Sequence, residues 1–235
     1  MMSFSGIRKQ FGQVCALHDV TLALRAGAVT ALVGPNGSGK TTLIKIALGL
    51  TRADQGEVRF DGRVVDDAGA YRAHVGYMPQ IARFPDPLTG RDVIELVSEL
   101  RTGVRRDESL IATLDLERSL DKRIGTMSGG TRQKLNAAIA FLFAPSLLVL
   151  DEPTSGLDPI SSGVLKDAVR AARDNGRTVL VTSHVLSELE ETADDVAFLC
   201  DGRLRFFGAV AVLLARTGAP TLERAIAQLM REEAA

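Results

Sequence analysis

The chain has 235 residues, with 28 lysine and arginine residues against 29 aspartate and glutamate residues, which gives a formal net charge of -1. This balance excludes the strongly basic surface that most nucleic-acid-binding proteins need, so we expect no nucleic-acid partner. A hydrophobic fraction of 46% and a charged fraction of 24% are ordinary for a globular protein, and the length indicates one domain.

Alternating apolar and polar residues in the first part of the chain are typical of antiparallel β-strands. The pattern predicts strands over residues 2–8, 20–25 and 28–33, separated by Gly12 and Gly27. A glycine-rich loop and a helix over residues 41–50 follow. Another short strand is predicted over residues 56–60, where the Asp61-Gly62 pair indicates a turn.

Helical patterns take over from residue 88 to residue 143. Two short, continuously apolar runs follow, at residues 147–150 and 178–182, and such runs are typical of parallel strands buried on both faces. A helix predicted over residues 159–173 lies between them, which makes a βαβ unit. The segment after Gly208 predicts one or two surface helices. We therefore expect an α/β fold with a parallel-sheet core, an antiparallel edge and a helical insertion.

The glycine-rich loop fits the pattern G-x-x-x-x-G-K-[ST] at every fixed position. A triphosphate must be wrapped by backbone N–H groups, and glycines permit that close approach and the unusual φ values it requires. The helix that starts after Lys40 adds its positive N-terminal end. The predicted nucleotide-binding residues here are Gly34, Asn36, Gly37, Ser38, Gly39, Lys40, Thr41 and Thr42.

Chemistry assigns roles to two residues of this loop. Lys40 should reach the β- and γ-phosphates, and the hydroxyl of Thr41 should hold Mg²⁺. The predicted cofactors are therefore ATP and Mg²⁺. A chance glycine-rich turn is the alternative, but the strand before the loop and the helix after it both fit the motif.

Two carboxylates, Asp151 and Glu152, follow the apolar run 147–150. Ligands of parallel sheets bind at the carboxyl ends of the strands. Asp151 would hold Mg²⁺ directly or through water, and Glu152 would orient or deprotonate the attacking water. Two solvated acids that cap a strand are the alternative for the pair alone. With the glycine-rich loop present, the pair predicts a P-loop NTPase.

Further motifs resemble those of the ABC ATPases and occur in that family's order. Residues 127–134, Met-Ser-Gly-Gly-Thr-Arg-Gln-Lys, resemble the signature motif, residues 77–80 the Q-loop, residues 155–158 the D-loop and residues 182–184 the switch histidine. The matches cover nearly the whole chain. They imply an α/β, P-loop NTPase fold of the ABC ATPase type, with a RecA-like parallel-sheet core, an antiparallel β edge and a helical signature subdomain.

The resemblance also implies roles for individual residues. Gln80 would contact Mg²⁺ or the attacking water, and His184 would contact the γ-phosphate and fix that water. Phe11 would stack on adenine, although an aromatic residue on an early strand is often a core residue. The catalytic residues are therefore predicted to be Lys40, Gln80, Glu152 and His184.

The signature residues would bind the nucleotide of a second protomer. Ser128, Gly129 and Gly130 open a helix, so hydroxyl, free N–H groups and helix dipole all point at an anion. In the resembled fold they complete the partner's site, together with Asp158 of the D-loop. The sequence departs from the signature at Met127 and Thr131, where the family usually has Leu and Gln. His18 and His74 match no motif, and we assign them structural roles.

The resemblance implies a homodimer of ATPase subunits beneath a separate transmembrane permease subunit. We divide the single domain into a core with its β edge (1–80 and 145–208), a helical subdomain (81–144) and a C-terminal helical tail (209–235). No apolar stretch reaches the about 20 residues of a membrane span. We expect a cytoplasmic subunit, peripheral at the cytoplasmic face of the membrane.

Two further segments indicate which class of ABC protein the chain resembles. Residues 77–85 and 156–160 look most like the ATPases of ABC-2-type, multidrug-like exporters, and also like the ATPase that serves copper-site maturation of nitrous-oxide reductase. The alternative is a soluble ABC ATPase that couples ATP to another protein. A P-loop kinase would not need the signature motif.

Overall fold

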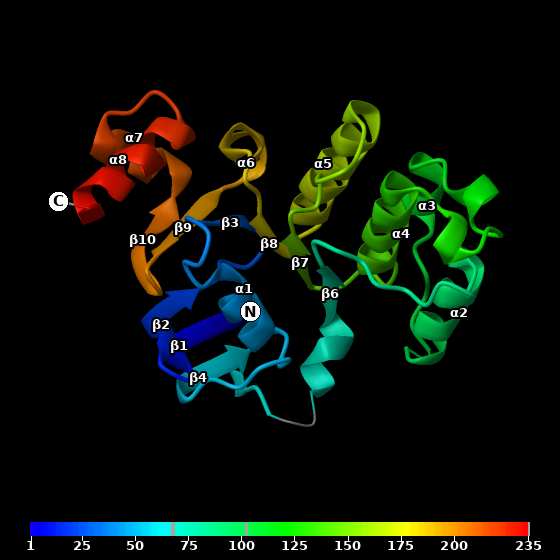
Figure 1. Cartoon of the computed structure of the whole chain (residues 1–235), viewed down its shortest axis with the longest axis horizontal. Helices are drawn as coiled ribbons and strands as arrows, with labels where there is room; N and C mark the ends of the chain where they lie inside the picture. Colours follow the sequence, from blue (N-terminus) through cyan, green and yellow to red (C-terminus); the bar gives the residue numbers. More distant parts are fainter. Residues whose placement is uncertain (67–68, 102, 235) are drawn as a thin grey trace.

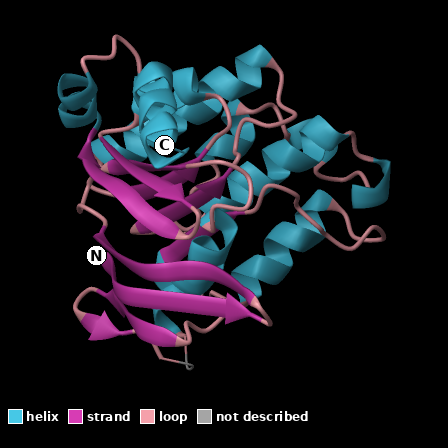
Figure 2. Ribbon diagram, turned by 60° about the vertical axis from the view of Figure 1, so that its left-hand side comes forward, coloured by secondary structure: helices cyan, strands magenta, loops and turns pink. Residues whose placement is uncertain are grey.

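Two β-sheets form the centre of the molecule, and helices cover the far face of one of them (Figures 1 and 2). The computed structural model describes residues 1–66, 69–101 and 103–234. Asp67, Ala68, Thr102 and Ala235 lie outside the described residues, and Ala235 is the last residue of the predicted C-terminal tail.

The larger sheet has six strands in the order β10-β9-β3-β8-β7-β6. The neighbours from β9 to β6 run parallel, and β10 is antiparallel to β9. The strands are β3 (Val29–Val33), β6 (Val75–Met78), β7 (Leu147–Asp151), β8 (Thr178–Thr182), β9 (Asp195–Cys200) and β10 (Arg203–Ala209). The predicted parallel-sheet core is confirmed.

The direction of β3 corrects one prediction. The strand expected at residues 28–33 was grouped with the antiparallel strands, but β3 runs parallel to both β8 and β9. All five residues of β3 are buried. When both faces of a strand are buried, its residues are apolar on both sides, and apolar and polar residues do not alternate. The sequence of β3 therefore could not show whether the strand is parallel or antiparallel.

Alternate residues of the central strands contribute to two different hydrophobic clusters. In β7, Leu148 and Leu150 pack with the helices on one face, while Leu147 and Val149 pack toward the smaller sheet. All four are fully buried. Burying a leucine or valine side chain contributes about 1.5–3 kcal/mol. The two-sided burial explains why the sequence here is continuously apolar.

The smaller sheet is antiparallel, in the order β2-β1-β4-β5. Its strands are β1 (Met2–Phe11), β2 (Val14–Ala23), β4 (Gln55–Phe60) and β5 (Arg63–Val64). Helix α1 (Lys40–Ala47) lies between this sheet and the parallel one, where Leu43 and Ile44 are buried. The predicted antiparallel edge is confirmed, but β2 begins six residues before the predicted strand at 20–25.

Three helices lie together on one side of the molecule, drawn in green in Figure 1. They are α2 (Gly90–Glu99), α3 (Ser109–Thr113) and α4 (Gly129–Phe141), and they fall within the stretch predicted to be helical. Helix α4 contacts β6 of the sheet. Thr89 caps α2 through a capping box with Asp92, which explains where that helix begins.

Four more helices follow β7, namely α5 (Pro159–Asp174), α6 (Leu186–Thr192), α7 (Val210–Thr217) and α8 (Leu222–Ala234). The last two correspond to the predicted C-terminal helices. They are more than surface helices, because Leu213, Leu222 and Ala225 are fully buried in the same cluster as the parallel sheet. Helix α8 also contacts α6.

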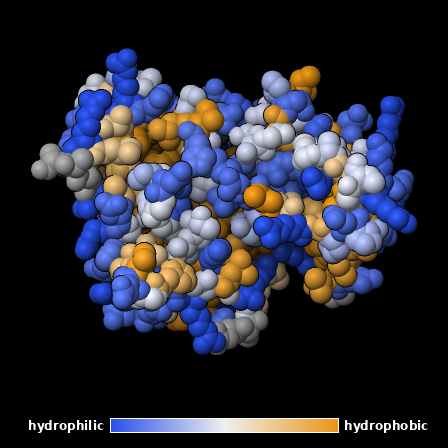
Figure 3. Space-filling model, in the orientation of Figure 1, coloured by the Kyte–Doolittle hydropathy of each residue, from blue (hydrophilic) through white to orange (hydrophobic). Residues whose placement is uncertain are grey.

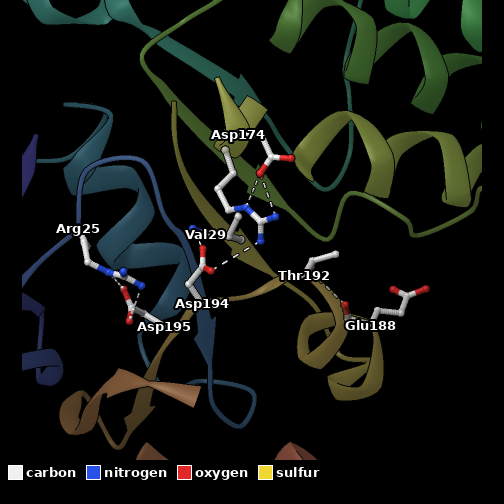
Figure 4. A network of polar contacts seen from close by, with 8 residues as sticks. Arg25, Val29, Asp174, Glu188, Thr192, Asp194 and Asp195 are labelled. Atoms are coloured by element: carbon white, nitrogen blue, oxygen red, sulfur yellow. Dashed lines mark hydrogen bonds and ion pairs between the residues drawn. The ribbon is translucent and has the colours of Figure 1, made fainter. Parts of the chain in front are cut away.

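A polar network holds the amino ends of β3 and β9 together (Figure 4). The N–H of Val29 donates to Asp194 Oδ2 at 2.8 Å, and the N–H of Asp194 donates to the Val29 carbonyl. Arg25 donates to both carboxylate oxygens of the buried Asp195, and Arg173 lies 3.6 Å from Asp194. The charged groups of this network therefore lie at the amino ends of the parallel strands, at the opposite end of the sheet from the carboxyl ends.

Hydrophilic side chains predominate on the face of the molecule shown in Figure 3, and the hydrophobic ones form separate groups. Within the part of the chain that the structure describes, every helix is too short or too polar to cross a membrane.

Adjacent residues of α7 test whether the C-terminal helices belong to the fold. Leu213→Ala should lower the free energy of unfolding by about 2–5 kcal/mol, because Leu213 is fully buried and the substitution leaves a cavity. Val212→Ala is the control and should change it by about 0.5 kcal/mol or less, because Val212 is 58% exposed. Urea unfolding measures both. Equal effects would show that α7 is not part of the core.

Candidate active site

A cavity of about 470 Å³ opens at the carboxyl ends of the parallel strands. The loop after β3, the end of β7 and His184, two residues after β8, all reach it, as expected for a parallel sheet. Most of the predicted site residues line it together: Asn36, Gly37, Ser38, Gly39, Lys40, Thr41, Thr42, Gln80, Asp151, Glu152 and His184.

Two glycines of the loop are required by close backbone contacts. A Cβ atom on Gly34 would lie 2.0 Å from the carbonyl oxygen of Leu199, and one on Gly39 would lie 2.6 Å from that of Ala16. Gly39 also has φ of +103°, which side chains disfavour. Gly34 does not line the cavity itself. Its role is to let the loop lie directly against β9.

Lys40 begins α1 and points back into the loop. Its Nζ donates to the carbonyls of Gly34 at 2.7 Å and Pro35 at 3.0 Å. Burial lowers the pKa of Lys40, while the charges of Glu152 and Asp151 act to raise it. Helix α1 has no side-chain cap, so its first N–H groups remain available to an anion.

Glu152 and His184 face each other across the ends of β7 and β8. The backbone N–H of His184 donates to Glu152 Oε2 at 3.0 Å, and His184 Nε2 lies 3.3 Å from Oε1. Glu152 is buried, whereas the side chain of His184 is 59% exposed. The buried carboxylate is therefore held by an imidazole that is open to the cavity.

The environment of Glu152 changes its acidity. Burial raises the pKa of Glu152, and the neighbouring charge of Asp151 also raises it, while the N–H and the charge of His184 and the charge of Lys40 act in the opposite direction. Burial is the largest of these effects. A carboxylate whose pKa is raised is a stronger base than an ordinary one.

Gln80 lies between two cavities. It is exposed, it follows β6, and it lines both the main cavity and a second one of about 430 Å³. The second cavity is also lined by Phe84, Gly129, Arg132, Gln133 and Gly156. Gln80 is thus the predicted site residue that connects the sheet to the helical side of the molecule.

Ser128, Gly129 and Gly130 lie outside the main cavity. Ser128 caps α4: its Oγ accepts from the N–H of Thr131 at 3.1 Å and forms a 2.8 Å hydrogen bond with the Thr131 hydroxyl. Thr131 therefore supports the signature serine directly. The structure separates these three residues from the phosphate loop of the same chain.

The D-loop packs against the signature helix. A Cβ atom on Gly130 would lie 3.3 Å from the carbonyl oxygen of Gly156. Asp158 caps α5 by accepting from the N–H and the hydroxyl of Ser161, and these bonds lower its pKa to about 2. Lys134 Nζ lies 3.7 Å from the same carboxylate. Asp158 also lies outside the main cavity.

Phe11 ends β1 at the rim of the site. It pairs in register with Val14, which lines the cavity, but Phe11 is not itself among the lining residues. Its ring is half exposed, and Lys9 Nζ lies 5.2 Å from the ring centroid. Stacking on adenine remains a prediction.

Sequence reasoning missed one wall of the cavity. This wall is formed by β2 and by the turn between β9 and β10: Val14, Cys15, Ala16, His18, Asp201 and Gly202. The N–H of His18 donates to Gly202, and the N–H of Gly202 donates to Ser38 in the phosphate loop. The Asp201-Gly202 pair is a turn signal that could have been found. His18, to which we assigned a structural role, lines the cavity. His74 does not, and stacks on Phe60.

The residues present fit a nucleotide with Mg²⁺. The Oγ of Ser38 is buried and has no hydrogen-bond partner among the described residues, as expected of a group that awaits a phosphate oxygen. Lys40 supplies the positive charge. Mg²⁺ binds by one or two protein oxygens together with phosphate and water, which matches Thr41 and Asp151 at the cavity.

Comparison with known proteins decides the family. The family described as "ABC transporter" matches residues 17–155. The chain is 35% identical to the daunorubicin resistance ATP-binding protein DrrA3 of Streptomyces coeruleorubidus over 94% of this chain and 72% of that protein. This protein belongs to the ABC transporter ATP-binding family.

Two further comparisons support that membership. The Nod factor export ATP-binding protein I of Burkholderia lata is 32% identical over 91% of this chain and 72% of its own length. A solved ATP-binding subunit of an ABC transporter superposes with a TM-score of 0.92 at 27% identity, over 98% of this chain and 99% of that one. The predicted ABC ATPase fold is confirmed, and the relatives agree with the predicted resemblance to ABC-2-type exporter ATPases.

The raised pKa of Glu152 predicts an unusual acid limb in the pH–rate profile. The carboxyl must be deprotonated to accept a proton, so kcat/KM for ATP should fall on acidification at a pH above the ordinary value of 4.5. In His184→Gln the attraction of the imidazole is lost, so the limb should move to still higher pH. Steady-state ATPase assays across the pH range measure this. Glu117→Gln, at an exposed site, should leave the limb unchanged; an unmoved limb in His184→Gln contradicts the coupling.

Proposed function

We propose that this chain is the ATP-hydrolysing subunit of an ABC exporter and that it acts as a dimer on a separate membrane subunit. The observation that carries the proposal is the convergence of the phosphate loop, Gln80, Asp151, Glu152 and His184 on one cavity. These residues come from distant parts of the chain. Together they supply a phosphate cradle, Mg²⁺ ligands and a base.

The roles follow from the positions of the groups. Lys40 and the loop N–H groups bind the β- and γ-phosphates. Thr41 and Asp151 hold Mg²⁺, with Gln80 beside them. Glu152 orients the attacking water and accepts its proton, and His184 holds the Glu152 carboxylate and contacts the γ-phosphate. Mg²⁺, when bound, neutralises charge that develops on the phosphoryl oxygens.

The position of the signature residues supports a two-subunit site. Ser128, Gly129 and Gly130 form a capped helix start suited to an anion, yet they lie outside the cavity that holds the phosphate loop. A second copy facing the first brings its Ser128 to the γ-phosphate. ATP then joins two subunits, and hydrolysis removes that attraction.

The membrane partner is proposed from the relatives and from the second cavity. The names of the similar proteins, a daunorubicin resistance protein and a Nod factor export protein, favour an exporter. Residues 80–84 line the cavity of about 430 Å³ beside α4, and Phe84 packs partly against the core. A transmembrane permease subunit contacting this region would respond to Gln80. Service of a copper-maturation system and coupling to a soluble protein are the alternatives.

The division of the chain and its location are also proposals. Helices α2, α3 and α4 support a helical subdomain over residues 81–144, set beside a core formed by 1–80 and 145–208 with a tail from 209. A subunit that acts on a permease lies at the cytoplasmic face of the membrane, where ATP is available.

Paired lysine variants test the proposed activity. Lys40→Ala should reduce Mg²⁺-dependent ATP hydrolysis by about 100-fold or more, because removal of a positioned cation from a phosphoryl-transfer site costs several kcal/mol in the transition state. Lys45→Ala is the control, because Lys45 is exposed on the same helix. Phosphate release by the purified proteins measures both. Equal rates for wild type and Lys40→Ala would show that the assigned site does not hydrolyse ATP.

A second pair of variants tests the dimer. Glu152→Gln keeps the size of the side chain but cannot accept a proton, so it should accumulate a dimer in Mg·ATP. Ser128→Arg added to Glu152→Gln should abolish that dimer and leave ATP binding within about threefold, because Ser128 serves the opposite site. Ala112→Arg, exposed on α3, is the control substitution. Size exclusion with light scattering reports the mass; a Glu152→Gln protein that stays monomeric in saturating ATP rules out the two-subunit site.

A further inference from the structure

Strands β7 and β8 end side by side at the site (Figure 1). Asp151 and Thr182 are register partners at the last rung of this parallel pair. Glu152, the residue after Asp151, carries the carboxylate already described, and His184, two residues after Thr182, carries the imidazole. Thr182 opens the segment 182–184 that resembles the switch-histidine motif, but the resemblance gives its own side chain no role, and it does not line the cavity. It nevertheless contacts both carboxylate residues of the site.

The hydroxyl of Thr182 joins those two residues. Its Oγ1 donates to Asp151 Oδ1 at 2.6 Å and accepts from the backbone N–H of Glu152 at 3.0 Å. The carbonyl of Thr182 accepts from the same N–H at 3.2 Å. Thr182 is 1% exposed, so water does not replace these bonds. One buried hydroxyl therefore fixes one oxygen of Asp151 and the main chain of Glu152.

The backbone of Glu152 needs such support. Its φ is +52°, in the left-handed region that residues with a side chain seldom adopt. A strained conformation of this kind persists only where surrounding contacts over-determine it, and such residues cluster at active sites. The contacts here are the two bonds that the Glu152 N–H donates to the hydroxyl and the carbonyl of Thr182, and the bond that the His184 N–H donates to the Glu152 carboxylate. The segment 182–184 thus holds Glu152 at both ends.

We propose that Thr182 is a positioning residue for ATP hydrolysis: its hydroxyl sets the carboxylate of Asp151 for Mg²⁺ and the turn that presents the carboxylate of Glu152 to the attacking water. The inference rests on the proposed function, because it assumes that Asp151 and Glu152 have those roles. Small displacements of catalytic groups have large effects on rate. A hydroxyl that acts only on stability would change the melting temperature and leave the turnover number unchanged.

The chain offers a matched control on the same strand. Thr178 begins β8, is fully buried, and its Oγ1 accepts from the N–H of Gly27 at 3.0 Å, at the opposite end of the strand from Asp151. Thr178→Val and Thr182→Val both replace a buried hydroxyl by a methyl group of similar volume. Thr182→Ser keeps the hydroxyl and removes only the methyl group.

The experiment compares wild type, Thr182→Val, Thr182→Ser and Thr178→Val as full-length chains. Each is measured for kcat and KM of Mg·ATP hydrolysis, for the Mg²⁺ concentration at half-maximal rate, for ATP affinity by calorimetry and for the melting temperature without nucleotide. Thr182→Val should lose about 10- to 100-fold in kcat, as is usual when a partner of a metal-ligating group is removed. ATP affinity should change by less than about threefold, because the phosphate loop is untouched.

The other arms separate positioning from stability. In Thr182→Val the Mg²⁺ concentration at half-maximal rate should rise. Thr182→Ser should have a kcat within about threefold of wild type, because it keeps the hydroxyl. Thr178→Val should lower the melting temperature without lowering kcat. Thr182→Ala is the second variant, for use if Thr182→Val folds poorly. It also removes the hydroxyl, without introducing the two methyl groups of valine, and it must show the same loss of kcat.

Three results overturn the inference. If Thr182→Val hydrolyses ATP with the kcat of wild type while Lys40→Ala is inactive, the proposed function stands and the role of Thr182 fails. If Thr178→Val loses as much kcat as Thr182→Val, the effect belongs to the stability of β8. A wild-type chain that neither binds nor hydrolyses ATP overturns the proposed function itself, and with it this inference.

Discussion

Burial of the parallel strands on both faces is the constraint on which the site depends. Because β3, β7 and β8 contribute alternate side chains to two hydrophobic clusters, none of them can rotate or slide without exposing apolar surface. Their carboxyl ends are therefore fixed relative to one another. The phosphate loop, Asp151 with Glu152, and His184 each lie at or within two residues of one of these ends, so the core determines how they are placed relative to one another.

Charged residues at the amino ends of the parallel strands stabilise the fold. There, Asp194 and Asp195 bind the Val29 backbone, Arg173 and Arg25, and join the first residues of β3 and β9. Asp194 and Asp195 are paired with arginines, whereas among the described residues the ion pair of Glu152 is with His184, whose side chain is open to the cavity. The same chemical group, a carboxylate, thus stabilises the fold at the amino ends of the strands and stays available for chemistry at their carboxyl ends.

The sequence was informative where chemistry demands particular residues at a fixed spacing. The phosphate loop and the Asp151-Glu152 pair were predicted from the chemistry of phosphate and Mg²⁺ binding, and His184 from the resemblance to the ABC ATPases; the structure brings all of them to one cavity. The direction of β3 was predicted wrongly, because a strand buried on both faces gives no alternation from which its pairing could be inferred. The wall formed by His18 and Gly202 was also missed. The Asp201-Gly202 pair indicates a turn, but the bonds that join this wall to the loop run through backbone N–H groups, so the sequence does not show where the turn lies.

Thr182 illustrates the same limit at the level of one atom. From the sequence it is the last residue of an apolar strand, and a threonine there is ordinary. Only the register of β7 and β8 shows that its hydroxyl lies between Asp151 and the main chain of Glu152. Positioning residues of this kind depend on pairings between distant segments, which a single sequence does not contain.

Lys40 shows how the loop is prepared for its ligand. Its ammonium is already bound by the carbonyls of Gly34 and Pro35, and burial lowers its pKa. The side chain is thus held inside the cradle, so little rotational freedom remains to be lost on binding. A phosphate oxygen carries a negative charge, and charge-assisted hydrogen bonds are about twice as strong as bonds to neutral acceptors. The anion also offsets the cost of partly burying the ammonium. The loop therefore favours a charged phosphate over a neutral ligand of the same size, and Ser38 provides a further hydroxyl for it.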